Sequence, residues 1–219
     1  MSKKFIYYVL IISLFITEPL WATSTGLNNI PTADVVPESV LVFQYFTDVG
    51  NDNVPDHFAG FKYGPMKNVE IGLDGRVFPE KGKEESIVAQ GKMRFELDQN
   101  LAIAFGIANL GDRDKAGDEF PFGVLSCDLD FMRLHVGGTT QDDNEGFFFG
   151  LDKTVKFLER DFMIRSDLLQ VNNQSDTLAS IGFIYDLGHN FLVESWASFP
   201  SQSGKEDVVT IKFNYVIKF

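Results

Sequence analysis

The chain has 219 residues, a net charge of −12 and an aromatic content of 14%, with 22 phenylalanines against two tryptophans. Such an acidic chain repels the phosphates of nucleic acid, so we expect no nucleic-acid partner. The single cysteine, Cys127, excludes an internal disulfide framework. Beyond the N-terminal segment, no apolar run approaches the roughly 20 residues of a membrane-spanning helix. An outward-facing membrane surface is one place for so much aromatic surface.

The N-terminal segment has the pattern of a secretory signal peptide over residues 1–22. Lys3 and Lys4 precede an apolar run from Phe5 to Ile16, and the small residue Ala22 follows. Residues 23–38 contain Gly, Asn and Pro and show no sustained period, which predicts a short extended arm. Residues 39–219 are predicted to form one β-barrel domain.

From Val40 onward the apolar residues recur with a period of two, which indicates an all-β fold. In residues 69–77, for example, Val69, Ile71 and Leu73 share one face while Glu70 and Asp74 share the other. Segments of this kind have the length of tilted membrane-spanning strands, and we count ten to twelve. They lie near residues 40–47, 57–63, 68–77, 86–97, 101–109, 119–129, 131–138, 146–152, 161–170, 177–185, 190–198 and 207–219.

The links between these segments alternate in length. Long links rich in Asp, Asn and Gly are expected at residues 48–56, 78–85, 110–118, 139–145, 171–176 and 200–206. The links between them are mostly tight, near Gly64, Asp98, Asp130 and Asp186. One rim with loops and one with turns is typical of a closed antiparallel transmembrane barrel with both termini periplasmic. Residues 153–160 do not fit, because a short turn is expected there.

Periodicity alone serves a soluble barrel equally well, so the orientation of the two faces needs other observations. The chain ends in strict alternation, which resembles the C-terminal signal read by the outer-membrane assembly machinery; its residues are Phe213, Tyr215, Ile217 and Phe219. The opposite faces carry charges of mixed sign, as a polar lumen requires. The predicted lumen-facing residues are Lys62, Glu70, Asp74, Arg76, Lys92, Arg94, Glu96, Arg133, His135, Arg165, Asp167, Glu194 and Lys212.

Three stretches carry a family resemblance. They are GLNNIPTADVVPE at residues 26–38, FAGFKYGP at residues 58–65, and the ending at Phe219. With these, the chain resembles the Gram-negative outer-membrane barrels related to the YjbH-like family. The resemblance implies a link to exopolysaccharide production and export, and it brings no catalytic residues.

Two features of the sequence are candidates for a chemical site, His135 and residues 112–118. His135 is the one histidine placed where a lumen site could form, but no G-x-S-x-G pattern accompanies it, so we expect it to hydrogen-bond neighbouring polar groups. Residues 112–118 begin like a calcium loop, but Gly123 stands where the twelfth-position acid is required. We expect a solvated acidic loop, with weak cation bridging to lipopolysaccharide as the alternative. No cofactor or metal is predicted.

The sequence therefore predicts a non-enzymatic protein of the outer membrane. It is expected to be a narrow channel or an accessory barrel for surface-polysaccharide export. A structural barrel without transport, a lipid-modifying enzyme around His135 and, last, a soluble periplasmic binding barrel are the alternatives. The small face of residues 101–109, with Ala102 and Ala104, either packs against a bulky neighbour or leaves room for a pathway. Expected partners are outer-membrane lipids and lipopolysaccharide, the assembly machinery and polysaccharide-export components.

Overall fold

The computed structural model describes residues 26–50, 55–78, 86–112, 118–141, 144–170 and 177–219. The predicted signal peptide and most of the predicted calcium-like loop lie outside these residues. The described residues form twelve strands: β1 (Val40–Val49), β2 (Pro55–Met66), β3 (Val69–Val77), β4 (Ile87–Asp98), β5 (Leu101–Gly111), β6 (Phe120–Leu129), β7 (Met132–Gln141), β8 (Asn144–Phe157), β9 (Arg160–Gln170), β10 (Thr177–Gly188), β11 (Phe191–Pro200) and β12 (Val208–Lys218).

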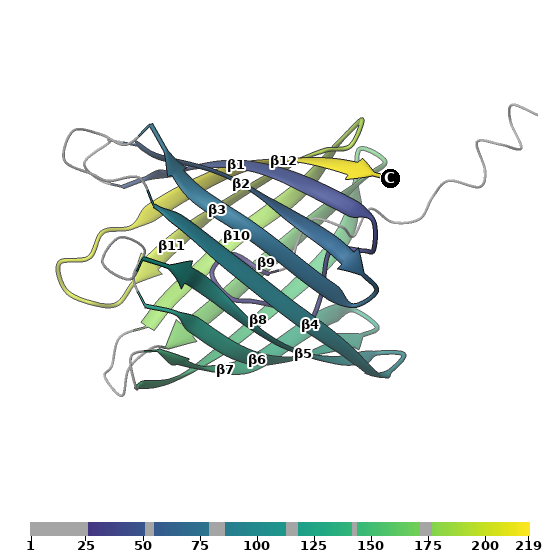
Figure 1. Cartoon of the computed structure of the whole chain (residues 1–219), viewed down its shortest axis with the longest axis horizontal. Helices are drawn as coiled ribbons and strands as arrows, with labels where there is room; N and C mark the ends of the chain where they lie inside the picture. The colour runs from purple at the N-terminus through teal and green to yellow at the C-terminus, as the bar shows by residue number, and fades with distance from the viewer. Residues whose placement is uncertain (1–25, 51–54, 79–85, 113–117, 142–143, 171–176) are drawn as a thin grey trace, which may run out of the picture.

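Each strand pairs antiparallel with the one before it, and β1 pairs with β12 to close the ring (Figure 1). In the closing pair, Val40 lies opposite Lys218 and Val49 opposite Val209. At the same seam, the Phe219 N–H donates a hydrogen bond of 3.0 Å to the carbonyl of Ser39, the residue before β1. The predicted closed antiparallel barrel is confirmed, with the upper strand number of the predicted range.

One rim of the barrel is made of two-residue turns, at residues 67–68, 99–100, 130–131, 158–159 and 189–190. Asn68, His189 and Asn190 take left-handed φ values of 66°, 55° and 67° there, as tight hairpin turns require. Both ends of the barrel, Val40 and Lys218, lie at this rim because the number of strands is even. Bacterial outer-membrane barrels have their short turns on the periplasmic side, so the prediction of periplasmic termini concerns this rim.

Two links differ from the expectation. Residues 153–160 are not a long link, because β8 continues to Phe157 and only Leu158 and Glu159 form the turn. Both take left-handed φ values of 50° and 64° without Gly or Asn, so the usual turn signal is missing. The prediction of a long link at residues 139–145 is also wrong. The pairing of β7 with β8 continues through polar residues at the rim as far as Gln141 and Asn144.

The two faces of the wall point the way that a membrane barrel requires. On β1, Phe43 is 48% exposed on the outside, whereas its neighbour Val42 is fully buried inside. On β4, Met93 and Phe95 are each 47% exposed, whereas Lys92, the residue before Met93, is buried. A soluble barrel would hide the apolar face inside. An apolar outer surface on a closed barrel belongs in a bilayer, and the protein is an outer-membrane barrel.

Aromatic side chains pair across neighbouring strands on this outer surface. The rings of Phe191 and Tyr215 lie 4.6 Å apart, and those of Phe95 and Phe105 meet edge to face at 6.3 Å. Phe213 and Phe219 of the predicted assembly signal also face outward. Among the described residues, no helix is long and apolar enough to cross a membrane.

Candidate functional site: a lumen occupied by the N-terminal arm

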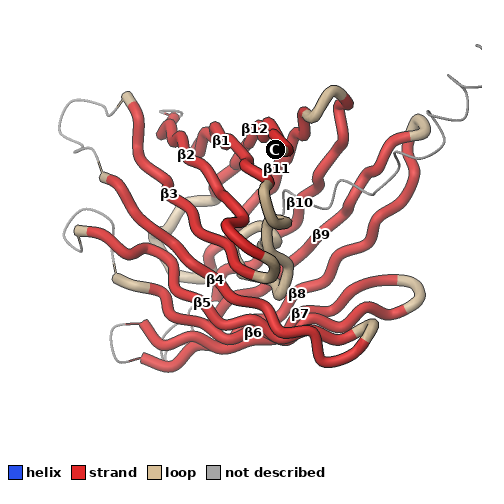
Figure 2. Tube along the Cα trace, turned by 45° about the vertical axis from the view of Figure 1, so that its right-hand side comes forward, coloured by secondary structure: helices blue, strands red, loops and turns tan. Residues whose placement is uncertain are grey.

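Residues 26–39, which we call the arm, run inside the ring of strands rather than beside it (Figures 1 and 2). The arm hydrogen-bonds to seven strands on different sides of the barrel, which a segment outside the wall could not reach. The wall residues that make these bonds are Glu70 on β3, Lys92 on β4, Ser126 on β6, Arg133 on β7, Asp167 on β9, Ser180 on β10 and Ser198 on β11. The predicted extended arm is thus a plug in the lumen.

The tip of the arm is a tight turn with an apolar contact surface. The Leu27 N–H donates to the Ile30 carbonyl at 2.9 Å. Leu27 and Ile30 are buried against Ala102, Ala104 and Phe148 of the wall. The small face of β5 therefore packs against a bulky neighbour, which is the first of the two alternatives weighed for it.

Two wall glycines leave space for this tip. A Cβ at Gly150 on β8 would collide with the end of the Leu27 side chain and would lie 2.7 Å from Cδ1 of Ile30. A Cβ at Gly182 on β10 would meet Trp196 and Ser195 of the wall first and would lie 2.7 Å from Oδ1 of Asn28. A larger side chain at Gly150 would therefore occupy the volume of the arm, and one at Gly182 would collide with both the wall and the arm.

Polar groups hold the tip from the other side. The backbone N–H groups of Asn28 and Asn29 both donate to Oδ2 of Asp167, at 2.7 and 3.1 Å. The Asn28 side chain donates to Oγ of Ser180 at 2.7 Å, and the Asn29 side chain to Oγ of Ser198 at 3.0 Å. Successive N–H groups converging on one carboxylate form an anion-binding turn. The predicted lumen residue Asp167 is therefore an anchor for the arm.

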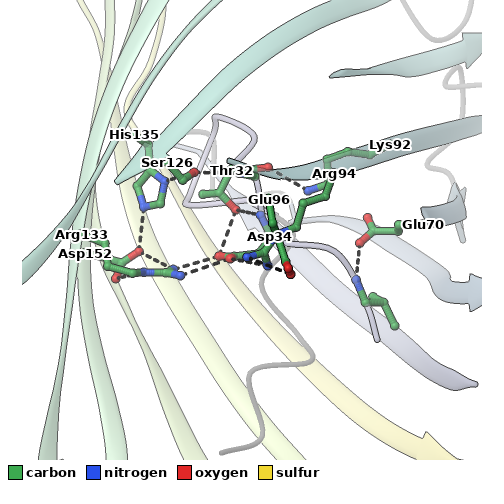
Figure 3. Close-up of polar contacts among 12 residues, drawn as sticks. Thr32, Asp34, Glu70, Lys92, Arg94, Glu96, Ser126, Arg133, His135 and Asp152 are labelled. Atoms are coloured by element: carbon green, nitrogen blue, oxygen red, sulfur yellow. Dashed lines mark hydrogen bonds and ion pairs between the residues drawn. The ribbon is translucent and has the colours of Figure 1, made fainter. Parts of the chain in front are cut away.

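A second anchor encloses residues 33 and 34 of the arm (Figure 3). The Ala33 N–H donates to Oγ of Ser126 at 2.9 Å, and Ser126 is hydrogen-bonded to Nδ1 of His135 at 2.7 Å. Nε2 of His135 lies 2.9 Å from Oδ2 of Asp152. Arg133 then joins Asp152 to Asp34 of the arm, with its Nη2 2.8 Å from Asp152 and 2.9 Å from Asp34. The chain of contacts starts and ends on the arm.

Asp34 stays ionised in this surrounding. Burial acts to raise the pKa of the Asp34 carboxyl, but the charge and hydrogen bonds of Arg133 outweigh it and lower the pKa below its ordinary value. His135 and Lys92 add smaller contributions in the same direction. The anchor is therefore a true ion pair at neutral pH.

Ser126, His135 and Asp152 form a hydrogen-bonded row, which bears on the lipid-modifying alternative. Its ring nitrogens are reversed from those of a hydrolase triad, because Nδ1 of His135 faces the serine and Nε2 faces the aspartate. The Ser126 oxygen, however, accepts the Ala33 N–H, and His135 and Asp152 are almost completely buried beneath the arm. In this arrangement the three residues fix the arm and present no exposed nucleophile.

The opposite wall carries its own ion-pair cluster. Glu194 on β11 accepts hydrogen bonds from Nη2 of Arg165 at 2.7 Å and from Nδ2 of Asn214 at 2.6 Å, and Nζ of Lys212 lies 3.3 Å away. The Arg165 guanidinium lies over the Trp196 ring at 5.4 Å. Two predicted lumen residues, Arg165 and Lys212, thus meet around the carboxylate of a third, Glu194.

A cavity of about 460 Å³ adjoins the tip of the arm, which forms one of its walls. Three lysines line it, Lys62, Lys92 and Lys212, with Glu70 as the lining acid. Nζ of Lys92 donates to the Thr32 carbonyl at 3.0 Å, and Glu70 accepts the Val36 N–H at 2.8 Å. The cavity is therefore basic, and the arm shares two of its charged residues.

The remaining predicted lumen residues contact other residues of the wall. Asp74 accepts from Nε2 of Gln90 at 2.7 Å. Nη2 of Arg94 lies 3.8 Å from Glu96. Arg76 sits apart from both anchors, where its Nε is 3.8 Å from Asp56 and its guanidinium is 5.5 Å above the Phe58 ring. Within the described residues, no group of three or more His, Cys, Asp or Glu side chains is placed to hold a metal ion.

Sequence reasoning named His135, Arg133 and Asp167 but missed their partners Ser126, Asp152 and Asp34. A signal for Ser126 was present. Once the turn of the β6–β7 hairpin is placed at residues 130–131, Ser126 falls directly opposite His135. No comparable signal exists for Asp34, because the arm has no period that would set its register.

Comparisons with known proteins agree with the class that the fold defines, an outer-membrane β-barrel. No protein-family model and no curated protein sequence matches the chain. Among solved structures, it is similar to the KdgM porin, with a TM-score of 0.65 and 9% identity over 80% of this chain and 98% of that one.

Two further solved structures share the architecture. The NanC porin has a TM-score of 0.54 at 10% identity and covers 80% of this chain and 98% of its own. An outer membrane channel from Pseudomonas putida F1 has a TM-score of 0.52 at 7% identity, over 84% and 98% of the two chains. At these identities the likeness establishes the shared fold.

Proposed function

We propose that the protein is a narrow outer-membrane channel for small anionic solutes, acidic saccharides among them, and that the arm closes it in the state described here. The observation that carries this proposal is the basic cavity beside the arm, where Lys62, Lys92 and Lys212 surround about 460 Å³ of space. Rings of basic side chains in a lumen favour anions. One barrel of similar fold, the KdgM porin, has been solved in complex with disordered oligogalacturonate, an acidic saccharide.

The nature of the plug also supports a channel. A barrel that needs only a filled interior can use side chains of its own wall. Here the interior is filled by a separate segment, which joins the barrel at Ser39 on the short-turn rim. Ser39 has a left-handed φ of 61°, which is uncommon for a residue other than glycine. We propose that the arm swings about this residue and opens the lumen without changing the wall.

The proposed activity is non-enzymatic. The support is the position of Ser126, whose oxygen accepts a backbone N–H of the arm while His135 is completely buried. A role in surface-polysaccharide export, with export components as partners, remains a prediction from the resemblance to the YjbH-like family. We also propose that the apolar outer surface of the barrel contacts lipid and lipopolysaccharide. From the alternation of its C-terminal residues, we propose that the chain is read by the outer-membrane assembly machinery.

A permanently closed structural barrel is the second candidate. It is favoured by one observation, the hydrogen bonds that tie the arm to seven strands. Many bonds of this kind hold a plug firmly, and Arg133 and Arg165 of the wall are already paired with Asp152 and Glu194.

Planar-bilayer conductance separates the two candidates. The purified full chain is compared with a variant that lacks residues 26–36. A channel closed by its arm gives a small or intermittent conductance in the full chain and a larger, anion-preferring conductance in the shortened variant. No conductance from the shortened variant, shown to be folded by heat-modifiable migration on gels, contradicts the channel and leaves the structural barrel.

A further inference from the structure

The carboxylate of Asp34 lies between two arginines of the wall, Arg133 on β7 and Arg94 on β4, which we call the arginine pair (Figure 3). Nη1 and Nη2 of Arg133 donate to Oδ1 and Oδ2 of Asp34 at 3.1 and 2.9 Å. Nη1 of Arg94 lies 3.9 Å from Oδ1. Two parallel N–H···O bonds are the arrangement by which a guanidinium recognises a carboxylate. The carboxylate in this site comes from the arm and not from the wall.

The wall orients the arginine pair without help from the arm. Nε and Nη2 of Arg133 donate to Asp152 at 3.1 and 2.8 Å, and Asp152 is fixed in turn by His135. Nη2 of Arg94 lies 3.8 Å from Glu96 on the same strand. Each arginine therefore keeps a wall carboxylate when Asp34 leaves, so the site is preorganised.

The arginine pair is connected to the basic cavity. Lys92 lies two residues before Arg94 on β4, so both side chains share the inner face of that strand. Lys92 lines the cavity and also donates to the carbonyl of Thr32, two residues before Asp34. Basic side chains thus lead from the cavity toward the carboxylate of Asp34.

We propose that the arginine pair is a binding site for the carboxylate of a passing acidic saccharide, and that Asp34 is a tethered competitor which occupies this site while the lumen is closed. The inference rests on the proposed channel function and adds its substrate chemistry and its regulation. A solute carboxylate that takes the place of Asp34 releases one anchor of the arm. The solute thereby favours the open state that admits it.

Binding measurements on the full-length protein in detergent micelles test the site directly. The ligand is trigalacturonate, and neutral maltotriose is the matched control. Asp34→Asn removes the competing charge, and Glu38→Gln removes an exposed charge from the base of the same arm. We expect Asp34→Asn to bind trigalacturonate about tenfold more tightly than the unaltered chain, because the site is no longer occupied. Glu38→Gln is expected to bind like the unaltered chain.

A second variant shows whether the gain depends on the arginine pair. In Asp34→Asn combined with Arg133→Gln, the tighter binding should disappear, and retained heat-modifiable migration confirms that this variant is folded. Equal affinity of Asp34→Asn and Glu38→Gln, or a gain that survives loss of Arg133, would overturn the proposal.

Arm movement provides a readout that needs no conductance. Thr32 is completely buried, so Thr32→Cys in a Cys127→Ser background reacts slowly with a charged thiol reagent while the arm is in place. Trigalacturonate should raise the labelling rate several-fold and maltotriose should leave it unchanged. If neither saccharide changes the rate, Asp34 is not a competitor.

The two proposals fail in different ways. Tight, Arg133-dependent binding together with silence of every variant in the planar bilayer would retain the carboxylate site and reject the channel. Anion-preferring conductance with no effect of Asp34→Asn on binding or labelling would retain the channel and reject the tethered competitor.

Discussion

Asp34 and Arg133 lie 99 positions apart in the sequence, yet their side chains share two hydrogen bonds inside the lumen. This contact joins a segment without regular structure to the wall of a rigid barrel. It also places the arm's aspartate next to Asp152, so that Arg133 forms ion pairs with two carboxylates at once. A single guanidinium therefore links the arm to both β7 and β8.

Replacing Arg133 should be costly. Arg133→Gln leaves Asp34 and Asp152 without their shared cation, and removal of one partner from a buried pair costs about 3–5 kcal/mol. We expect a clear fall in the free energy of unfolding, measured by urea titration in detergent or lipid. The matched control is Lys156→Gln, which breaks an exposed pair with Asp161 and should cost less than about 1 kcal/mol. Equal effects of the two variants would show that the ion pairs of Arg133 contribute no more to the free energy of unfolding than an exposed pair does.

Filling the space left by Gly150 should displace the arm. A branched side chain in Gly150→Ile occupies the positions of Leu27 and Ile30 at the tip. We expect higher conductance, or faster labelling of Thr32→Cys, with the barrel still assembled. Leu27→Ala added to Gly150→Ile returns part of the volume and should restore closure. If Gly150→Ile prevents assembly altogether and Leu27→Ala does not rescue it, the glycine is required for packing within the wall and not for space beside the arm.

Acid should release the second anchor. Asp34 lies on the arm, outside the membrane-spanning strands, and its pKa is lowered chiefly by Arg133 against the effect of burial. Because the folded-state pKa is lowered, its stabilising contribution is complete above the ordinary value of 3.8 and is lost as the pH falls through the lowered pKa. The charged groups that face it are Arg133 and His135 from β7, Lys92, Arg94 and Glu96 from β4, and Asp152 from β8.

Labelling of Thr32→Cys after acid incubation measures this release. Between pH 7.5 and 5 the rate should reflect only the chemistry of the reagent, and exposure of the arm should begin below pH 3.8. In Asp34→Asn the acid-dependent part should be much smaller. An arm that opens between pH 7 and 5 would point to another titrating group.

The C-terminal residue tests assembly. The side chain of Phe219 is 79% exposed on the outer surface, while its N–H holds the Ser39 carbonyl. Phe219→Ser keeps this backbone bond and removes only the aromatic ring. We expect lower levels in the outer membrane than for Phe131→Ser, which removes an exposed ring from a turn. Normal levels of Phe219→Ser would mean that the ring is not read during assembly.

The barrel could be predicted from the sequence because every strand carries the same information. Phe43 and Phe95 alternate with inward residues, and this period of two can be recognised in each segment without knowing which strand pairs with it. The orientation of the faces followed from the chain end and the mixed charges. Strand limits at residues 139–145 and 153–160 were wrong because polar ladders and turns without Gly or Asn give no boundary signal.

The plug could not be predicted in the same way. Leu27 and Ile30 are two apolar residues in a short segment without a period, and such a pair fits an exposed arm as well as a buried one. The wall partners of the arm lie far along the chain, with Ser126 93 positions from Ala33 and Ser198 169 positions from Asn29. Contacts of this range depend on the closed shape of the barrel, which local patterns do not specify.

The hydrogen bond between Phe219 and Ser39 joins the last residue of the chain to the base of the arm. The seam that completes the cylinder and the proposed hinge of the arm therefore share a hydrogen bond. In the proposed channel, a barrel whose seam is still open lacks this bond at the base of its arm, so we expect closure by the arm to depend on pairing of β12 with β1.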